Sequence, residues 1–343
     1  MKQVENILYV QTQGSYLRLD HDTLIIEVEK EKKSQIPLHH LGGVVMFGNV
    51  LISPFLIHRC AEDGRDVVWL SQGGRFRARL SGPTTGNVLL RRAQHEAVRD
   101  AALTLAIARN FVAGKLQNTR QTLLRAARET DNEDDVTALR RVADLHADTI
   151  RKLPTLKHLD EIRGAEGDAA SSYFSVFNRM IVTNKDTFVF SGRNRRPPLD
   201  PVNALLSFVY ALIRNECVGA CESVGLDPQM GFLHALRPGR PALALDLMEE
   251  FRSCYADRLV LTLINRGQLT KDDFVTRPGG AVELTETARK TVLVTYQKRK
   301  AEEVTHNVLA RATPYALIPH VQARLLARHL RGDLLEYQPY LQR

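Results

Sequence analysis

Cysteine is scarce in this sequence, and its positions argue against cysteine-based metal sites. The chain has four cysteines in 343 residues, and no two of them form a Cys-x-x-Cys pair. Cys217 and Cys221 are four residues apart on an expected helix, a poor arrangement for tetrahedral zinc, whose paired ligands usually come from turns and recur twice. We therefore expect buried thiols in a reducing compartment.

The sequence also lacks the marks of membrane, secreted and ATP-driven proteins. No uninterrupted apolar run reaches the length of a membrane span, and residues 1–14 lack the apolar core of a signal peptide. The segment GPTTGN at 82–87 has neither the glycine spacing of a phosphate-binding loop nor a following Lys-Ser or Lys-Thr. We expect a cytoplasmic protein that uses no membrane and no ATP.

Acidic residues are outnumbered by basic ones. Lys and Arg together number 47 against 39 Asp and Glu, which gives a net charge of +8. Basic side chains gain affinity for polyanions because they displace counterions from phosphates. The charge balance therefore favours a polyanionic partner, without establishing one.

The hydrophobic pattern changes its period along the chain. Residues 6–80 contain short stretches rich in β-branched and aromatic residues, separated by turn residues, with one helical segment at 53–64. From residue 88 onward, apolar residues recur at helical spacing. We predict an α+β multidomain fold with a small N-terminal β-sandwich or β-roll domain at 1–86 and a larger all-α domain at 87–343.

Three carboxylates and a histidine form the first candidate site. Asp246, Glu249 and Glu250 stand at i, i+3 and i+4, so they share one face of an expected helix. His234 precedes the turn RPGRP, which could fold it back over that helix. Glu166 is flanked by glycines and followed by small residues, which would let another helix approach closely. Carboxylates with an imidazole suit Mg²⁺ or Mn²⁺.

Spacing alone leaves a second interpretation open. An amphipathic helix with a solvated acidic face gives the same pattern, and one histidine among scattered glutamates is common by chance. Glu216 and Glu222 would be equally plausible contributors to a metal site.

Four sequence blocks, in this order, resemble the CRISPR-associated endonuclease and integrase family of spacer acquisition. They are RGAEGDAASSYF at 163–174, RRPPLDPVNALLSFVYALI at 195–213, LDPQMGFLH at 226–234 and RPGRPALALDLMEEFR at 237–252. The resemblance covers nearly the whole chain and is greatest to the type I-C variety. It implies that the β domain serves dimerisation and that the helical domain is catalytic and binds metal and DNA.

The resemblance also implies roles for single residues. The catalytic metal ligands of the family fall on Glu166, His234 and Glu249, with Mg²⁺ or Mn²⁺ as the cofactor. Some members have aspartate at the last of these positions, where this chain has a glutamate that still supplies an oxygen. Asp246 matches a nearby acid of the family and is expected to be an auxiliary residue, whereas Glu250 is expected to be solvated.

The implied reaction is the insertion of captured DNA into a CRISPR array. A 3′-hydroxyl attacks a phosphodiester at the repeat boundary, and water in its place gives endonuclease activity on double-stranded, branched and single-stranded DNA. The implied partners are DNA, a second copy of the chain, and a small second adaptation protein whose dimer is clasped by two homodimers. A structure-specific nuclease of DNA repair and a non-catalytic DNA-binding scaffold are the alternative functions.

Further polar residues are auxiliary candidates. Arg252 could steady a phosphate, or it could be a surface residue paired with Glu249 or Glu250. Asn203 lies on one helix face with Ser207 and Tyr210, and this face could be polar packing inside the helical domain or could reach the site. In the basic loop at 192–201, the arginines predicted to contact the DNA backbone are Arg193, Arg195 and Arg196, with a solvated linker as the alternative.

Overall fold

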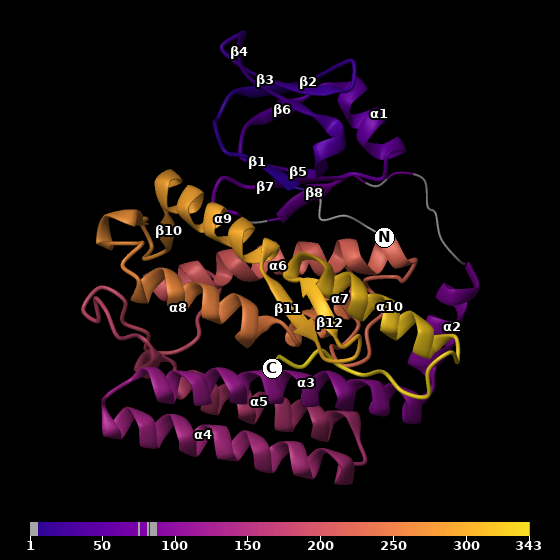
Figure 1. The fold of residues 1–343 in the computed structure, drawn as a ribbon, viewed down its shortest axis with the longest axis vertical. Helices are drawn as coiled ribbons and strands as arrows, with labels where there is room; N and C mark the ends of the chain where they lie inside the picture. Colours follow the sequence, from indigo (N-terminus) through magenta and orange to yellow (C-terminus); the bar gives the residue numbers. More distant parts are fainter. Residues whose placement is uncertain (1–5, 75, 81, 83–87, 343) are drawn as a thin grey trace. The chain divides into compact units, whose positions relative to one another are not determined.

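The computed structural model describes residues 6–74, 76–80, 82 and 88–342, and the chain divides into two compact units (Figure 1). The first unit comprises Met1–Thr85 with Leu284–Ala301, and the second comprises Gly86–Glu283 with Glu302–Arg343. The predicted boundary at residue 86 and residues 83–87 of GPTTGN lie outside the described residues. Two contiguous domains were expected, whereas helix α9 (Glu286–Ala301) groups with the first unit.

The first unit contains two four-stranded sheets around one apolar core. One sheet has the order β1-β5-β7-β8 and the other the order β4-β3-β2-β6. Leu17, Leu24 and Met46, from both sheets, are fully buried in the same cluster. The strands are β1 (Asn6–Val10), β2 (Ser15–Asp20), β3 (Thr23–Val28), β4 (Glu31–Pro37), β5 (Leu41–Phe47), β6 (Val50–Ile52), β7 (Asp66–Leu70) and β8 (Phe76–Arg79). The predicted N-terminal β domain is confirmed.

Local sequence explains most of these elements. Helix α1 (Pro54–Glu62) starts where Ser53 accepts a hydrogen bond from the Leu56 N–H at 3.2 Å, with proline as its first residue. Strand β4 was not expected, because EKKSQIP is polar and almost entirely exposed. It lies at the edge of its sheet, where lysines discourage pairing with another chain.

The second unit is built mainly of helices. Its α-helices are α2 (Val88–Arg99), α3 (Ala101–Glu129), α4 (Glu133–Lys152), α5 (Leu159–Ser175), α6 (Pro201–Val224), α7 (Ala242–Glu249), α8 (Arg258–Asn265) and α10 (Ile318–Leu330). The short turns are η2 (Leu153–Thr155), η3 (Phe177–Met180), η4 (Arg252–Asp257), η5 (Lys271–Asp273) and η6 (Tyr315–Leu317), with η1 (Leu38–His40) in the first unit. The all-α expectation omitted four short strands: β9 (Phe274–Thr276) pairs with β10 (Val282–Leu284), and β11 (Glu303–His306) with β12 (Arg311–Pro314).

The long helix α3 is central to the site. It packs against α4, α5, α7 and η4, and Figure 1 shows α3, α4 and α5 running side by side. Asp100 caps α3 by accepting the N–H groups of Ala102 and Leu103, and Asn132 caps α4 by accepting that of Asp135. Only residues 130–132 separate the two helices, which therefore form an antiparallel pair.

Helix α6 is both long and apolar. By length and composition it is the one described helix that could cross a membrane, but 67% of its apolar window is buried within the protein. The core helix of a globular protein passes the same test, so this is weak evidence for a span. The prediction of buried thiols is confirmed, because all four cysteines are buried thiols.

Candidate active site

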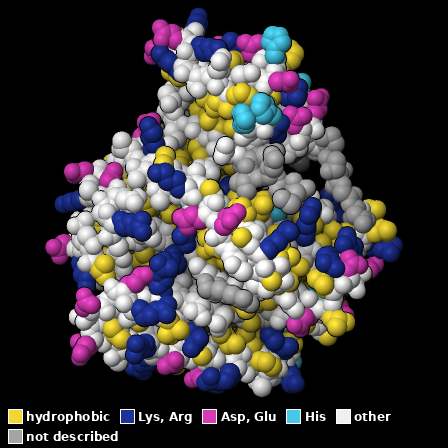
Figure 2. All heavy atoms as spheres, viewed as in Figure 1, with side chains coloured by type: hydrophobic (Ala, Val, Ile, Leu, Met, Phe, Trp, Pro, Cys, Tyr) yellow, Lys and Arg dark blue, Asp and Glu magenta, His cyan; other side chains and the backbone are white. Residues whose placement is uncertain are grey.

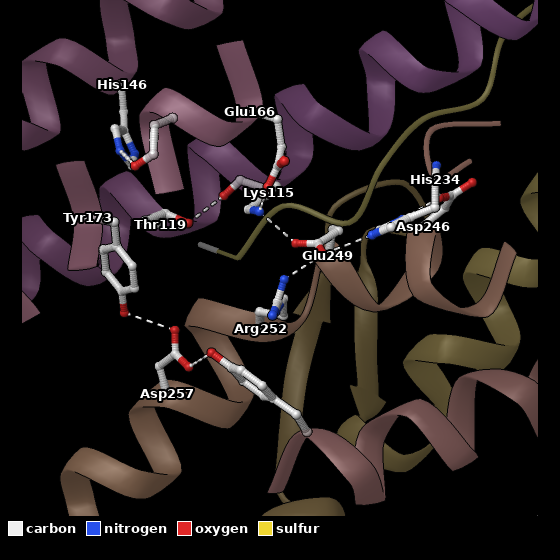
Figure 3. Close-up of polar contacts among 12 residues, drawn as sticks. Lys115, Thr119, His146, Glu166, Tyr173, His234, Asp246, Glu249, Arg252 and Asp257 are labelled. Carbon is white, nitrogen blue, oxygen red and sulfur yellow. Dashed lines mark hydrogen bonds and ion pairs between the residues drawn. The ribbon is translucent and has the colours of Figure 1, made fainter. Parts of the chain in front are cut away.

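Five polar side chains from separate segments of the second unit converge on one place (Figure 3). Lys115 comes from α3 and Glu166 from α5, while Glu249 is the last residue of α7 and Arg252 the first of η4. His234 lies in the loop between α6 and α7. The fold thus brings together the three residues that were predicted as metal ligands, and adds two cations between and beside them.

Glu249 is the centre of this cluster. Its side chain is 2% exposed, its Oε1 accepts a hydrogen bond from Arg252 Nη1 at 2.6 Å, and its Oε2 lies 2.7 Å from Lys115 Nζ. His234 Nε2 lies 3.8 Å from Glu249 Oε1. Burial raises the pKa of Glu249, but Arg252, Lys115 and His234 more than reverse this and lower it to about 2. Glu249 is therefore a buried carboxylate at neutral pH.

Asp246 fixes the position of His234. It is fully buried, and it accepts the backbone N–H groups of Phe232, Leu233 and His234 at 2.6, 3.0 and 2.9 Å. Its Oδ1 also lies 2.7 Å from His234 Nδ1. A carboxylate that already accepts three N–H groups can only accept again, so His234 Nδ1 is the donor to Asp246 and Nε2 is the ring nitrogen directed toward Glu249. Gly231 permits this approach, since a Cβ there would lie 2.7 Å from Asp246 Oδ2.

Lys115 joins the two glutamates that were predicted as ligands. Its Nζ forms an ion pair with Glu166 Oε1 as well as with Glu249 Oε2. Among the residues that the structure describes, no three His, Cys, Asp or Glu side chains are grouped so as to hold a metal ion. An ammonium group, rather than open space, lies between the two carboxylates.

The donor set nevertheless fits a hard divalent cation. Two carboxylates and a neutral imidazole nitrogen are the ligands that Mg²⁺ and Mn²⁺ take in proteins. Glu249 Oε2 is buried and accepts no hydrogen bond from any described residue other than its contact with Lys115. This oxygen therefore has free lone pairs at a place that already holds positive charge.

A π-helical turn shapes the other side of the site. Such turns are rare, and many occur at functional sites. Within η4, the buried Asp257 accepts hydrogen bonds from the hydroxyl groups of Tyr173 and Tyr210 at 3.0 and 2.5 Å. Burial raises the pKa of Asp257 to about 6. The Arg252 guanidinium lies 4.6 Å from the centroid of the Tyr210 ring, so this arginine is held from two sides.

The turn borders a cavity of about 210 Å³. The charged and aromatic residues that line it are Lys115, His146, Glu166, Tyr173, Phe174, Arg195, Tyr210, Arg252 and Asp257. Sequence reasoning did not single out Asp257 or Tyr173.

The auxiliary candidates divide into two groups. Arg252 belongs to the site and is not a surface residue, since its side chain is 15% exposed. Asn203 instead holds the basic loop: it accepts a hydrogen bond from Arg193 Nη1 at 2.5 Å and donates to the Gly192 carbonyl at 2.8 Å. Arg193 is thus turned inward, and Ser207 also accepts from it at 3.2 Å. Among the loop arginines predicted to contact DNA, the exposed ones are Arg195 and Arg196.

Two expectations about the surroundings of the site were wrong. Glu250 is not solvated but fully buried, where it accepts hydrogen bonds from the Tyr337 hydroxyl, from Gln322 Nε2 at 2.9 Å and from the Tyr340 N–H at 2.7 Å. The glycines beside Glu166 do not admit a neighbouring helix, because a Cβ on Gly164 or Gly167 would meet no heavy atom within 4 Å.

Lys115 is the functional residue that sequence reasoning missed. It stands in FVAGKLQNT of α3, one turn after Phe111 and next to Leu116, both of which are fully buried. A single lysine on an otherwise buried helix face requires a buried partner, which is the signal that could have drawn attention to it. Its partners lie 51 and 134 residues away in sequence (166 − 115 and 249 − 115), so their identity was not readable from spacing.

Comparison with known proteins identifies the family. Residues 8–298 match the model of the family described as CRISPR associated protein Cas1. A CRISPR-associated endonuclease Cas1 of Moorella thermoacetica is 58% identical over 338 residues, covering 98% of both chains. Among solved structures, a casposase bound to integration product has a TM-score of 0.83 at 24% identity, covering 97% of this chain and 92% of that one.

A further structural neighbour is a Cas6-RT-Cas1–Cas2 complex. It has a TM-score of 0.81 at 23% identity and covers 98% of this chain and 36% of that one. At such identities the two structures show a shared fold only. The family match and the 58% identical relative show family membership. The chain therefore belongs to the CRISPR-associated endonuclease Cas1 family.

Proposed function

We propose that the chain is a metal-dependent DNA integrase and endonuclease of CRISPR adaptation. The observation that carries this is the convergence of Glu166, His234 and Glu249, from three separate segments, around one cation position. A casposase with the same fold is bound to integration product, which supports strand joining as well as cleavage. In the proposed reaction a 3′-hydroxyl attacks a phosphodiester at the boundary of a CRISPR repeat.

Glu166, His234 and Glu249 would hold Mg²⁺ or Mn²⁺. The ion would supply polarisation of the phosphodiester and neutralisation of the leaving oxygen. Asp246 keeps the His234 proton on Nδ1, so that Nε2 can act as a ligand. Arg252 stays charged: burial lowers its pKa, but Glu249, Tyr210 and Asp257 together raise it further, and the guanidinium can steady a phosphate next to the ion.

DNA would follow the basic surface around the site. Arg195 lines the cavity beside Glu166 and is also exposed, so it can contact a backbone phosphate near the reacting bond. Arg196 follows it in the same loop. Figure 2 shows Lys and Arg side chains spread over much of the displayed face of the protein, with Asp and Glu between them.

The partners would be DNA, a second copy of the chain and Cas2. The first unit exposes large apolar side chains that a homodimer would bury: Leu51 is 61% exposed and Phe55 is 76% exposed. Tyr16 is the register partner of Leu51 and is 36% exposed. A structural neighbour is a Cas6-RT-Cas1–Cas2 complex, which supports Cas2 as a partner. From the family resemblance we also propose that two homodimers clasp one Cas2 dimer. We also propose a cytoplasmic location and the type I-C variety.

Strand joining in vitro tests the proposal. Purified protein with Cas2 and Mn²⁺ is mixed with a labelled short duplex and a plasmid that carries leader and repeat. Wild type should join label to the repeat ends, whereas Glu166→Gln, His234→Ala and Glu249→Gln should not. Asp168→Asn, an exposed acid on the same helix as Glu166, is the matched control and should join normally.

Two other outcomes distinguish the alternative functions. Cleavage of branched DNA without joining would favour a structure-specific repair nuclease. DNA binding with no chemistry that depends on the three residues would favour a non-catalytic scaffold and would overturn the site assignment.

A further inference from the structure

Lys115 places its ammonium between the two carboxylates that would hold a metal ion. Its ammonium contacts one carboxylate from α5 and one from α7, and the residue is 8% exposed. A lysine is almost never buried unless it is paired. Here Lys115 is paired with both acidic residues that were proposed as metal ligands. Among the described residues it forms no ion pair with any other acidic side chain.

The two carboxylates explain why a cation is needed when no metal is bound. Glu249 is buried, and Glu166 is directed toward the same ammonium (Figure 3). Two ionised carboxylates at close range repel each other, and burial makes the repulsion stronger. An ammonium between the two carboxylates offsets most of this repulsion.

We propose that Lys115 is a built-in competitor of the divalent metal: its ammonium holds the cation position between Glu166 and Glu249 until the metal displaces it. This rests on the proposed use of a metal by the same residues. Metal affinity is then set by two opposing interactions, ligation by the carboxylates and loss of the Lys115 ion pairs. The site stays neutralised and folded without metal, and fills only where the metal concentration overcomes the lysine.

The neighbourhood of Lys115 gives the displaced side chain a destination. It lines the cavity of about 210 Å³, whose other walls include the buried carboxylate of Asp257 and the ring of Tyr210. Lysine has a flexible four-carbon stem and a compact charge, so it can move within such a space. Arg252 cannot follow, because it is bound to Glu249 Oε1 and lies over Tyr210. The two cations around Glu249 thus have different roles: Arg252 is fixed and Lys115 is exchangeable.

Mn²⁺ binding measured by titration calorimetry tests this with wild type, Lys115→Met, Lys115→Arg and His234→Ala. Lys115→Met should bind Mn²⁺ about tenfold more tightly than wild type, within the range of coupling between competing sites. Lys115→Arg keeps the charge and should bind no more tightly than wild type. Lys152→Met, at the exposed end of α4, is the matched control and should bind as wild type does.

The results separate this inference from the proposed function. If wild type binds Mn²⁺ through His234 but Lys115→Met binds with the same or weaker affinity, Lys115 does not compete and the inference fails alone. If Mn²⁺ binds neither wild type nor Lys115→Met, or binds without dependence on His234, both the metal function and the inference fail.

A second measurement covers the case in which Lys115→Met does not fold. Acetylation of lysines in the wild-type protein is followed by mass spectrometry with and without Mn²⁺. The Lys115 amine should react faster when Mn²⁺ is present, because it has lost its two ion pairs, while Lys152 should react at the same rate. An unchanged rate at Lys115 in protein shown to bind Mn²⁺ would overturn the inference.

Discussion

Glu249 and Glu250 are adjacent in sequence and equally buried, yet their surroundings are opposite. Glu249 is surrounded by Lys115, Arg252 and His234, and its pKa falls to about 2 despite burial. Glu250 meets only neutral donors, those of Tyr337, Gln322 and the Tyr340 backbone, so burial dominates and its pKa rises to about 8. One carboxyl is thus kept ionised and the other protonated at neutral pH.

This difference shows that burial alone does not make a functional carboxylate. Hydrogen bonds from neutral groups do not offset the desolvation of an ionised Glu250. The neighbouring cations do offset the desolvation of Glu249. The Glu250 cluster anchors the segment around Tyr337 and Tyr340 to the end of α7. Glu250 therefore helps to hold the end of α7, and with it the neighbouring Glu249, in place.

The largest expected effect separates the two glutamates by activity. Glu249→Gln should lower strand joining by about a thousandfold, because a Lewis-acid metal is worth several kcal/mol in the transition state. Glu250→Gln preserves shape and neutrality and should stay within a few-fold of wild type. Strand joining at saturating Mn²⁺ measures both. If Glu249→Gln and Glu250→Gln lose strand joining to the same extent, the two glutamates do not differ in function.

The second prediction concerns pH and stability without metal. The pKa of Glu250 rises from its ordinary 4.5 to about 8 in the folded protein. Its stabilising contribution is therefore complete below pH 4.5 and is lost as pH rises toward about 8, because the unfolded chain releases the proton first. Glu250→Gln should remove this loss, which we expect to be on the order of a few kcal/mol.

Urea unfolding at pH 5, 6.5 and 8 in EDTA measures the effect. Glu249 gives the opposite sign: its lowered pKa of about 2 contributes stability above pH 4.5, and this is lost as pH falls toward 2. Glu249→Gln should therefore keep the alkaline loss of the wild type. If Glu250→Gln keeps it too, Glu250 is not the group responsible.

The sequence revealed much of the Glu249 cluster and almost none of the Glu250 cluster. Glu166, His234 and Glu249 were identified by their motifs, and Asp246 by its helical spacing. Glu250 was misplaced because a glutamate is almost never fully buried unless it is paired, so water is its usual environment. Here its side chain is covered by residues 337–340, about 90 positions later in the chain, whose return no local pattern predicts.

The fold shows the same division. Strands with apolar residues and capped helices such as α1 were predictable from local patterns. The polar strand β4 was not, because EKKSQIP carries no alternating apolar residues, although its partner β3 is its neighbour in the chain. The grouping of α9 with the first unit was not, because it depends on residues far away in the sequence. Lys115 belongs to this second kind, since its role comes from helices that pack against α3.

A third prediction concerns the positioning of His234 on the Glu249 side. Asp246→Asn leaves one acceptor for the three backbone N–H groups and no longer fixes the imidazole proton on Nδ1. Strand joining should fall by about 10- to 100-fold, as for other partners that orient metal ligands. Mn²⁺ affinity should fall in parallel. Unchanged Mn²⁺ affinity with lost activity would mean that Asp246 acts on the reaction and not through His234.

The smallest expected effect distinguishes cations that serve DNA from those that serve the fold. Arg195 borders the Glu249 cluster and is exposed, whereas Arg193 is bound to Asn203 and Ser207. Arg195→Gln should reduce the slope of log K against log salt for DNA binding by about 0.9, the value for one phosphate contact. Arg193→Gln should leave the slope unchanged and lower stability by about 1 kcal/mol, since its hydrogen bonds are internal. Fluorescence anisotropy at several salt concentrations, with urea unfolding beside it, measures both. If the two variants change the slope equally, the loop as a whole contacts DNA, and the inward contacts of Arg193 are exchanged for phosphate on binding.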